Sequence, residues 1–204
     1  MTKGKENIMD KYDNFEKETL MLPLELAFHI AEAAHRNQYR VNGDYYFSHP
    51  LRMLDYYEDL LFKHLNPYKI ETLKDNNIPV EGIREIILLH DVIEDTIITH
   101  KDIKDTFYKN NLKEYFDNYI SVPLKLITHN KKDKYETYIK KVMSNPVSAL
   151  VKMIDLINNL DLLRLDKFEK KEYKRAIKYI NAFKTINDKY HYVENIFNYL
   201  QDIR

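Results

Sequence analysis

The sequence predicts an all-α protein, a single-domain bundle of helices. Apolar residues recur every three to four positions along most of the 204 residues, which is the spacing of one face of a helix. The chain has only three glycines, and this scarcity disfavours a turn-rich β protein. No segment shows the sustained apolar–polar alternation of a half-buried strand. At ordinary helix lengths the chain would form roughly eight to ten helices.

The chain is expected to form one domain preceded by a short arm. Residues 1–20 are charged and lack a clear apolar face, so we expect a loosely held N-terminal arm. Residues 21–204 carry the apolar periodicity, and no linker divides them, so we expect a single domain there. The C-terminal helices of this domain are expected within 167–202.

The first half of the domain is expected to contain two helices and two connections. Helical spacing of alanines and leucines predicts a helix over 22–38, with Pro23 in its first turn. An Asn-Gly pair then predicts a loop over 40–46, and we prefer a loop to a hairpin because no alternating strand flanks it. A second helix is expected from Ser48, as its N-cap, to about residue 65. Two prolines and polar residues predict a long connection over 66–79.

The second half is expected to be helical almost throughout. An apolar run predicts a central helix over 80–95. Thr99 and Asp102 resemble a capping box, with Asp in place of Glu, at the start of a short helix. Pro123 is expected to bend the segment over 112–128, and Asn145-Pro146 to start a long helix. The other expected helices span 135–143, 170–186 and 190–200.

Composition narrows the classes of function. Lys and Arg number 32 and so do Asp and Glu, so no global charge favours nucleic acid or an anionic membrane as a partner. The absence of cysteine excludes disulfides, thiolate zinc sites and a Cys nucleophile. No apolar run approaches the roughly 20 residues of a transmembrane helix, and the polar N-terminus does not resemble a signal peptide. We therefore expect a cytoplasmic protein. No feature predicts an oligomeric state.

The stretch 86–96 combines an apolar helix with a cluster of charged groups. Its isoleucines, leucines and valine cover nearly the whole circumference of a helix, which is typical of a buried helix. His90, Asp91, Glu94 and Asp95 nevertheless lie on it within an arc of roughly 140°. Unpaired charges near a core cost several kcal/mol each. A divalent metal ion in a cleft would compensate for them best, and a satisfied internal salt-bridge cluster is the alternative.

A metal ion needs further ligands, and two residues elsewhere in the chain are candidates. His49 lies at the start of the second helix, where a histidine is more often a capping or packing residue. Asp155 lies between Ile154 and Leu156 in an apolar helix face, where a carboxylate without a partner is costly. Together with His90 and Asp91 they place nitrogen and oxygen donors on three helices. This set suits a mixed-donor site that leaves positions open for water.

Four local stretches resemble the HD-domain metal-dependent phosphohydrolases, and in particular the hydrolase domain of the Rel/Spo-type alarmone enzymes. They occur in the same order as in that family and span about residues 27–165. In chain order they are Ala33-Ala34-His35 with Gln38 and Arg40; Arg40-x-x-Gly43-x-x-Tyr46-x-x-His49-Pro50-Leu51; Leu88-Leu89-His90-Asp91-Val92-Ile93-Glu94-Asp95-Thr96 with Thr99, Asp102 and Ile103; and Val151-Lys152-x-x-Asp155-x-x-x-Asn159.

The resemblance implies a role for each matched position. The metal ligands would be His49, His90, Asp91 and Asp155, and they would hold one divalent ion, Mn²⁺ in the alarmone hydrolases. The chain would be a small hydrolase-only protein that removes the 3′-pyrophosphate of (p)ppGpp and yields GDP or GTP and pyrophosphate.

The resemblance also implies roles for residues outside the ligand set. Glu94 and Asp95 would position or deprotonate the attacking water and handle the proton of the leaving group. Arg40 would lie against the guanine base, as a guanidinium stacks on flat rings, and a solvated loop arginine is the alternative. Asn42 and Asn159 would contact the nucleotide.

The last of the four stretches departs from the family pattern. The family usually has Asp-Arg-x-His-Asn, and this chain has Leu156 in place of the Arg and Asn158 in place of the His. Leu162 stands where a Thr is common, and Tyr45 where a Pro is common. None of these changes removes a proposed metal ligand, so they bear on which nucleotide is bound. A phosphohydrolase for another nucleotide is therefore the first alternative, and a non-catalytic nucleotide sensor or partner-binding helical domain is the second.

Overall fold

The protein is an all-α bundle, as the sequence predicts. The computed structural model describes four stretches of the chain: residues 21–40, 43–59, 78–161 and 169–192. Within them the secondary structure is helical, and Tyr39 and Tyr45 form one isolated antiparallel bridge. The expected N-terminal arm lies outside the described residues, as do the helix ends and connection expected over 60–77. No helix in the described part of the chain combines the length and apolarity needed to cross a membrane.

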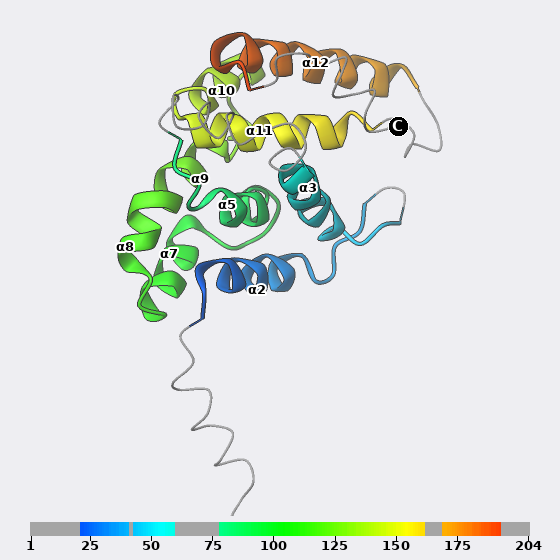
Figure 1. Ribbon diagram of the computed structural model, residues 1–204. Helices are drawn as coiled ribbons and strands as arrows, with labels where there is room; N and C mark the ends of the chain where they lie inside the picture. Colours follow the sequence, from blue (N-terminus) through cyan, green and yellow to red (C-terminus); the bar gives the residue numbers. More distant parts are fainter. Residues whose placement is uncertain (1–20, 41–42, 60–77, 162–168, 193–204) are drawn as a thin grey trace, which may run out of the picture.

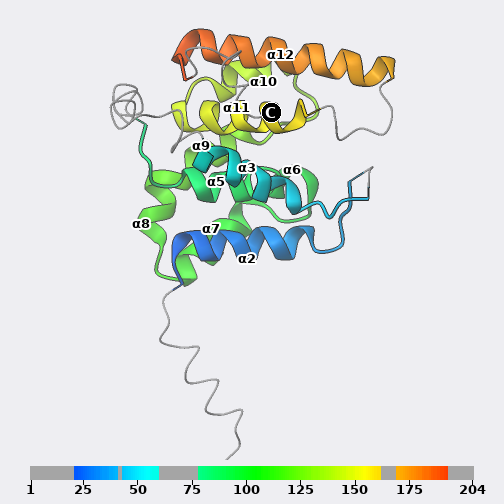
Figure 2. The ribbon, with the colours of Figure 1, turned by 45° about the vertical axis from the view of Figure 1, so that its right-hand side comes forward.

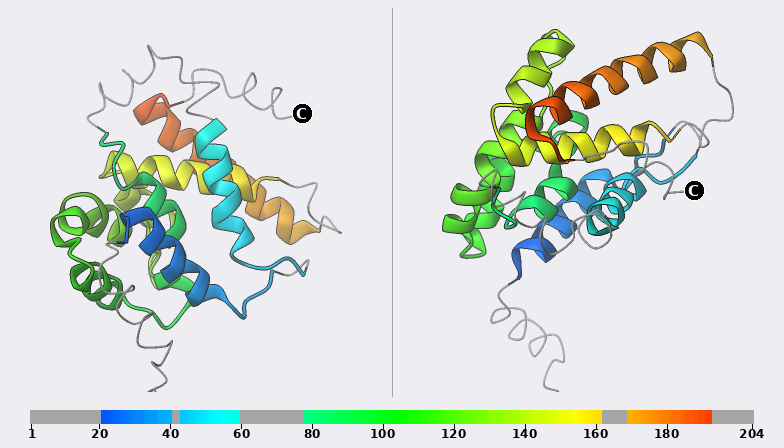
Figure 3. Two further views of the ribbon diagram at one scale, coloured as in Figure 1. Left: turned by 60° about the horizontal axis from the view of Figure 1, so that its bottom comes forward. Right: turned by 45° about the horizontal axis from the view of Figure 1, so that its top comes forward.

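The helices are stacked in layers around a central short helix. Figure 1 shows α12 (Lys170–Tyr190) lying along α11 (Pro146–Asn159), with α5 (Ile83–Leu89) below them and α2 (Pro23–His35) on the far side of α5. The same order of layers appears in Figure 2, after a turn of 45°. Helix α3 (Ser48–Asp59) contacts both α5 and α11 and so joins the layers, as the two views of Figure 3 also show.

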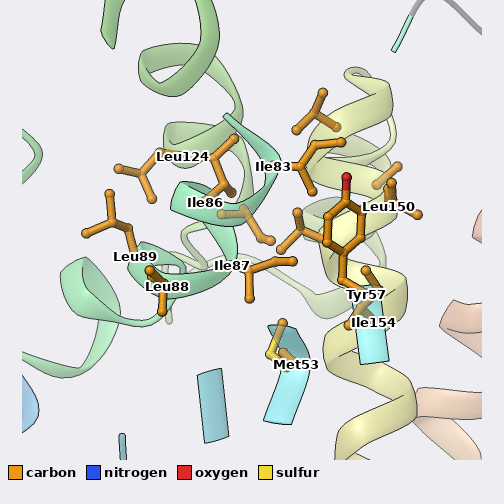
Figure 4. Packing of buried hydrophobic residues seen from close by; sticks show 14 of the residues in the cluster. Met53, Tyr57, Ile83, Ile86, Ile87, Leu88, Leu89, Leu124, Leu150 and Ile154 are labelled. Atoms are coloured by element: carbon orange, nitrogen blue, oxygen red, sulfur yellow. The ribbon is translucent and has the colours of Figure 1, made fainter. Parts of the chain in front are cut away.

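Helix α5 is buried on nearly all sides, as its apolar circumference predicts. Six of its seven residues are buried, namely Ile83, Glu85, Ile86, Ile87, Leu88 and Leu89. Figure 4 shows its aliphatic side chains among Met53 and Tyr57 of α3, Leu124 of α9 (Ser121–Ile127), and Leu150 and Ile154 of α11. Burying one such aliphatic side chain contributes about 1.5–3 kcal/mol, so the buried side chains of α5 contribute substantially to the core of the bundle.

The central helix is shorter than predicted and is interrupted. The sequence predicts one helix over 80–95, but the structure has α5 and α6 (Val92–Asp95), separated by His90 and Asp91. The His90 Nδ1 atom donates to the Ile87 carbonyl at 2.8 Å. A regular helix would use this carbonyl to accept the Asp91 N–H, so the imidazole competes with the backbone ladder. The start was also predicted too early, because Gly82 has a φ of +84° and precedes the helix.

The segment predicted as one bent helix over 112–128 contains a π-helical turn. It divides into α8 (Lys113–Tyr115), a π-helix over Phe116–Ile120, and α9. Pro123 has no N–H, and its ring crowds the carbonyl of Tyr119, so the regular α-helical ladder cannot continue there. The bulge therefore begins before the predicted bend at Pro123.

The loop after α2 is held by backbone hydrogen bonds across its two sides. Arg40 N–H donates to the Asp44 carbonyl at 2.8 Å, and Tyr46 N–H donates to the Gln38 carbonyl at 2.9 Å. This pairing is more hairpin-like than the open loop that we expected, although it forms no named strand in the described residues. Ser48 is the first residue of α3 rather than its N-cap.

The remaining helices agree with the sequence at most of their ends. Thr99 and Asp102 form the reciprocal capping box of α7 (His100–Lys109). The next predicted helix is α10 (Tyr135–Val142). The side chain of Asn145 caps α11 by accepting the Ser148 N–H.

Helix α12 differs from the prediction, because it runs to Tyr190 rather than to residue 186. It ends where His191 takes a φ of +51°. Most of the helix expected over 190–200 lies outside the described residues.

Gly82 is the glycine whose replacement should be most damaging to the fold. A Cβ atom there would lie 2.8 Å from both Cβ and the carbonyl oxygen of Tyr119, and the φ of +84° disfavours any L side chain. Gly43 has a similar φ of +85° but no atom within 4 Å of an added Cβ. We therefore expect Gly82→Ala to lower the free energy of unfolding by about 3 kcal/mol and Gly43→Ala by about 1 kcal/mol. Urea denaturation followed by circular dichroism would measure both, and equal losses would contradict the steric argument.

Candidate metal centre

Four side chains that the sequence predicts as metal ligands lie close together in the bundle. His49 is the second residue of α3, His90 and Asp91 lie between α5 and α6, and Asp155 lies inside α11. The ligand atoms of His49, His90 and Asp91 all lie within 4.8 Å of one another. The Asp155 Oδ1 atom lies 3.2 Å from His49 Nε2 and 3.9 Å from His90 Nε2. The group could therefore hold a metal ion.

Hydrogen bonds turn the same nitrogen of both imidazoles toward this point. The Nδ1 atom of His49 donates to the Asn158 side-chain carbonyl at 2.8 Å, and that of His90 donates to the Ile87 carbonyl at 2.8 Å. In the neutral rings each Nδ1 therefore keeps its hydrogen, and each Nε2 is the nitrogen that can offer a lone pair to an ion. The buried His90 Nε2 atom has no well-aligned hydrogen-bond partner in the described residues, although Asp91 Oδ2 lies 3.1 Å away. Such an orphaned ring nitrogen fits a metal ligand.

The two carboxylates of the group are also held by neighbouring donors. Asp155 Oδ2 accepts a hydrogen bond from the Lys152 ammonium at 2.7 Å, and its Oδ1 accepts from the Asn159 amide at 2.5 Å. Asp91 Oδ2 accepts from the Tyr46 hydroxyl at 2.7 Å. These contacts fix the orientation of the carboxylates before any ion binds, as the outer partners of a metal site do.

Mutual attraction shifts the pKa values of His90, Asp91 and Asp155 toward their charged forms. Burial alone would lower the pKa of His90, but Asp91 and Asp155 outweigh it and raise that pKa to about 9. Burial likewise opposes ionisation of the two carboxyls. Even so, His90 holds the pKa of Asp91 below its usual range, and Lys152 with the two histidines does the same for Asp155. Two imidazole nitrogens and two carboxylate oxygens suit several first-row divalent ions, Mn²⁺ among them.

Glu94 and Asp95, the predicted acid–base pair, lie on α6 beside the cluster. Glu94 Oε2 accepts the backbone N–H of His129 at 3.1 Å, and burial raises the pKa of its carboxyl above the usual range. Asp95 Oδ2 accepts from the Tyr46 hydroxyl at 2.8 Å, so this hydroxyl bridges Asp91 and Asp95. The two carboxylates thus differ in environment, as groups with different proton-handling tasks do.

Two of the three predicted nucleotide-contacting residues lie together. Arg40 Nη2 donates to the Asn159 side-chain carbonyl at 3.1 Å, and Asn159 in turn donates to Asp155. The buried Nη1 atom of Arg40 has no hydrogen-bond partner within the described stretches. The third residue, Asn42, lies outside the described residues. Arg40 is therefore anchored next to the ligand group, which argues against the freely solvated loop arginine.

Several polar residues at the centre received no role from the sequence. In the sequence, Tyr46 is only one residue of a matched motif, and Asn158 is only a departure from the family pattern. His129 belongs to none of the matched motifs. Asn158 had a usable signal, because it lies three positions after Asp155 on a helix whose other buried positions are mostly apolar. Tyr46 and His129 reach the centre only through the tertiary fold, so no local spacing identifies them.

Comparison with known proteins gives one partial relative. A stretch of 100 residues, 49% of this chain, is 31% identical to the GTP pyrophosphokinase Rsh of Brucella melitensis biotype 1. The stretch spans only 11% of the length of Rsh. No family model matches the chain. The chain is thus similar, over about half its length, to part of an enzyme that acts on a guanosine nucleotide.

Metal binding at this centre should release protons. Because the pKa of His90 is about 9 without an ion, the ring is protonated at neutral pH, and a ligand must lose that proton. We expect about one proton to be released per Mn²⁺ bound near pH 7.5, with affinity rising as the pH approaches 9. Titration calorimetry in two buffers of different ionisation enthalpy measures the release. A binding heat that is independent of the buffer would contradict it, and His90→Gln should abolish both the release and tight binding.

Proposed function

We propose that the protein is a metal-dependent phosphohydrolase that removes the 3′-pyrophosphate from (p)ppGpp, yielding GDP or GTP and pyrophosphate. The observation that carries the proposal is the convergence of His49, His90 and Asp91 within 4.8 Å, with Asp155 beside them. The order of the four sequence motifs and the similarity to the GTP pyrophosphokinase Rsh support a guanosine nucleotide as the substrate.

The proposed ligands of the ion are His49, His90, Asp91 and Asp155, and the proposed ion is Mn²⁺. When bound, the ion would lower the pKa of a water molecule and neutralise charge on the phosphate groups. The side chains around it would hold the two carboxylates and the two rings in place for this purpose. The mixed nitrogen and oxygen donors support a first-row ion over Mg²⁺ or Ca²⁺, which prefer oxygen alone.

Glu94 is the proposed base and Asp95 the proposed partner of the leaving group. A carboxyl whose pKa is raised by burial is a better proton acceptor near neutral pH than an exposed one, and Glu94 has this environment. Glu94 would take a proton from the attacking water as the new P–O bond forms. Asp95, held by Tyr46, would handle the proton that the leaving 3′-oxygen needs as the old P–O bond breaks.

Arg40, Asn42 and Asn159 are the proposed contacts to the nucleotide. The hydrogen bond between Arg40 and Asn159 supports a joint role, because it fixes one edge of the guanidinium and leaves its planar face for stacking on a base. Asn159 also donates to Asp155, so nucleotide contact and ligand orientation would be linked through one side chain. The role of Asn42 remains a prediction from the resemblance.

A phosphohydrolase acting on another nucleotide is the second candidate. Leu156 and Asn158 favour it, because the related enzymes have Arg and His at these positions. Leu156 is fully buried and cannot offer the positive charge of an arginine to a phosphate. Asn158 keeps a hydrogen bond to His49, so the change there leaves the ligand group supported. A non-catalytic nucleotide sensor would need a defective centre, whereas the proposed ligands and both acid–base carboxylates are present in this chain.

Product analysis tests the proposal directly. Purified protein with Mn²⁺ is given ppGpp, pppGpp and ordinary nucleoside mono- and triphosphates in parallel, and products are separated by anion-exchange chromatography. Release of GDP or GTP with pyrophosphate would support the proposed reaction. Turnover of another nucleotide alone would favour the second candidate, and binding without turnover would favour the sensor.

Glu94→Gln should separate chemistry from metal binding. The amide keeps the shape of the side chain and a carbonyl to accept the His129 N–H, but it cannot take up a proton. We expect kcat to fall by about 10²- to 10⁴-fold, with Mn²⁺ affinity changed less than about twofold. Glu114→Gln, an exposed substitution on α8, is the matched control. Asp91→Asn should instead lose the ion, and an active Glu94→Gln enzyme would reject the assigned role.

A further inference from the structure

His129 places a second titratable group against Glu94. It lies between α9 and α10, and its backbone N–H already donates to Glu94 Oε2 at 3.1 Å. The ring is a separate contact, with Nδ1 at 4.0 Å from Glu94 Oε1. The imidazole packs against Tyr138, with ring centroids 4.4 Å apart, and at a near-right angle to Tyr135. The ring therefore has a defined orientation.

The neighbours of the ring determine which of its nitrogens carries hydrogen. The Nε2 atom lies 3.4 Å from the backbone carbonyl of Asp133, which can only accept, so Nε2 is the donor. In the neutral ring Nδ1 is then a bare acceptor that faces a carboxylate oxygen of Glu94. At 4.0 Å the two acceptors are too far apart for a direct hydrogen bond, so a bridging water or a small rotation of either side chain would connect them.

The other charged and titratable groups nearby are engaged elsewhere. The Asp133 carboxylate pairs with Lys141 at 2.6 Å, and Lys152 pairs with Asp155 at 2.7 Å. The Tyr138 hydroxyl donates to the Ile127 carbonyl. Glu94 is therefore the acidic side chain in the described part of the chain that Nδ1 of His129 faces.

We propose that His129 is a positioning residue that acts through Glu94, accepting at Nδ1 the proton that Glu94 removes from the attacking water. The step rests on the proposed hydrolysis and balances: the water loses a proton to Glu94, Glu94 passes it to Nδ1, and the carboxylate is restored. The imidazolium keeps its Nε2 hydrogen bond to Asp133. Its side chain is 22% exposed, so the proton can then leave to solvent.

Kinetics of His129→Asn test the proton transfer. The backbone bond to Glu94 survives any substitution at this position, and asparagine retains a polar atom near the site of Nδ1 without titrating. We expect kcat to fall by about 10-fold or more, with KM changed less than about twofold. At saturating Mn²⁺, kcat should fall on the acid side of its pH profile, which is its acid limb. In the natural enzyme this limb should reflect two groups that must lose protons, and in the variant only one. An unchanged limb would overturn the proposal. His29→Asn, an exposed substitution on α2, is the matched control.

A second measurement does not depend on the substrate. Nitrogen-15 NMR of the Mn²⁺-free protein reports which nitrogen of neutral His129 carries hydrogen. The proposal expects hydrogen on Nε2, and an Nδ1-protonated ring would overturn it. If no nucleotide is hydrolysed, the proposed function fails. The NMR measurement of the tautomer can still be made in that case, and it shows whether Nδ1 of His129 faces Glu94 as an acceptor.

Discussion

The hydrogen bond from His90 to the Ile87 carbonyl is the interaction on which the centre and its surroundings depend. It ends α5 at the point where the apolar core meets the cluster of charged side chains. The same bond keeps the hydrogen of the neutral ring on Nδ1, so Nε2 is left to bind an ion. One contact therefore sets both the length of the central helix and the chemistry of the residue that follows it.

Burial of the cluster requires that each polar group have a specific partner. A buried charge without one costs several kcal/mol, about 3–5 when a single partner is removed. Here Lys152 balances Asp155, Tyr46 donates to Asp91, and Asn158 accepts from His49. Each ligand lies on or beside a helix whose other side chains pack in the core, and this rigid packing holds the donors in position. Packing in the apolar core thus holds the polar side chains of the site in a precise arrangement.

The fold was predictable from local patterns, whereas the supports of the centre were not. Helical spacing and the capping residues Thr99 and Asn145 predict the helices well, because both depend on neighbours within a few positions. The break at His90 was missed, since it depends on a side chain that competes for a backbone carbonyl. The π-helical turn lies before Pro123, where only a bend was predicted. The proposed ligands were identified because charges in apolar helices are conspicuous. Tyr46 and His129 have no such signal, because only the tertiary fold brings them to the carboxylates.

Two of the departures of this chain from the alarmone-hydrolase pattern, Leu156 and Asn158, lie on α11 beside the proposed ligand Asp155. Asn158 accepts from His49, so it supplies the hydrogen bond that orients a proposed ligand. Leu156 follows Asp155 directly. It is buried among apolar side chains and supplies neither a charge nor a hydrogen bond. The proposed ligands and acid–base carboxylates are thus kept, while one changed position supports a proposed ligand and the other is buried in the core. In the proposed enzyme, hydrolysis would depend on the ligands and carboxylates and nucleotide choice on the residues that contact the nucleotide, so the two could vary independently. The proposed reaction at the ion is therefore better supported than the identity of the nucleotide that it acts on.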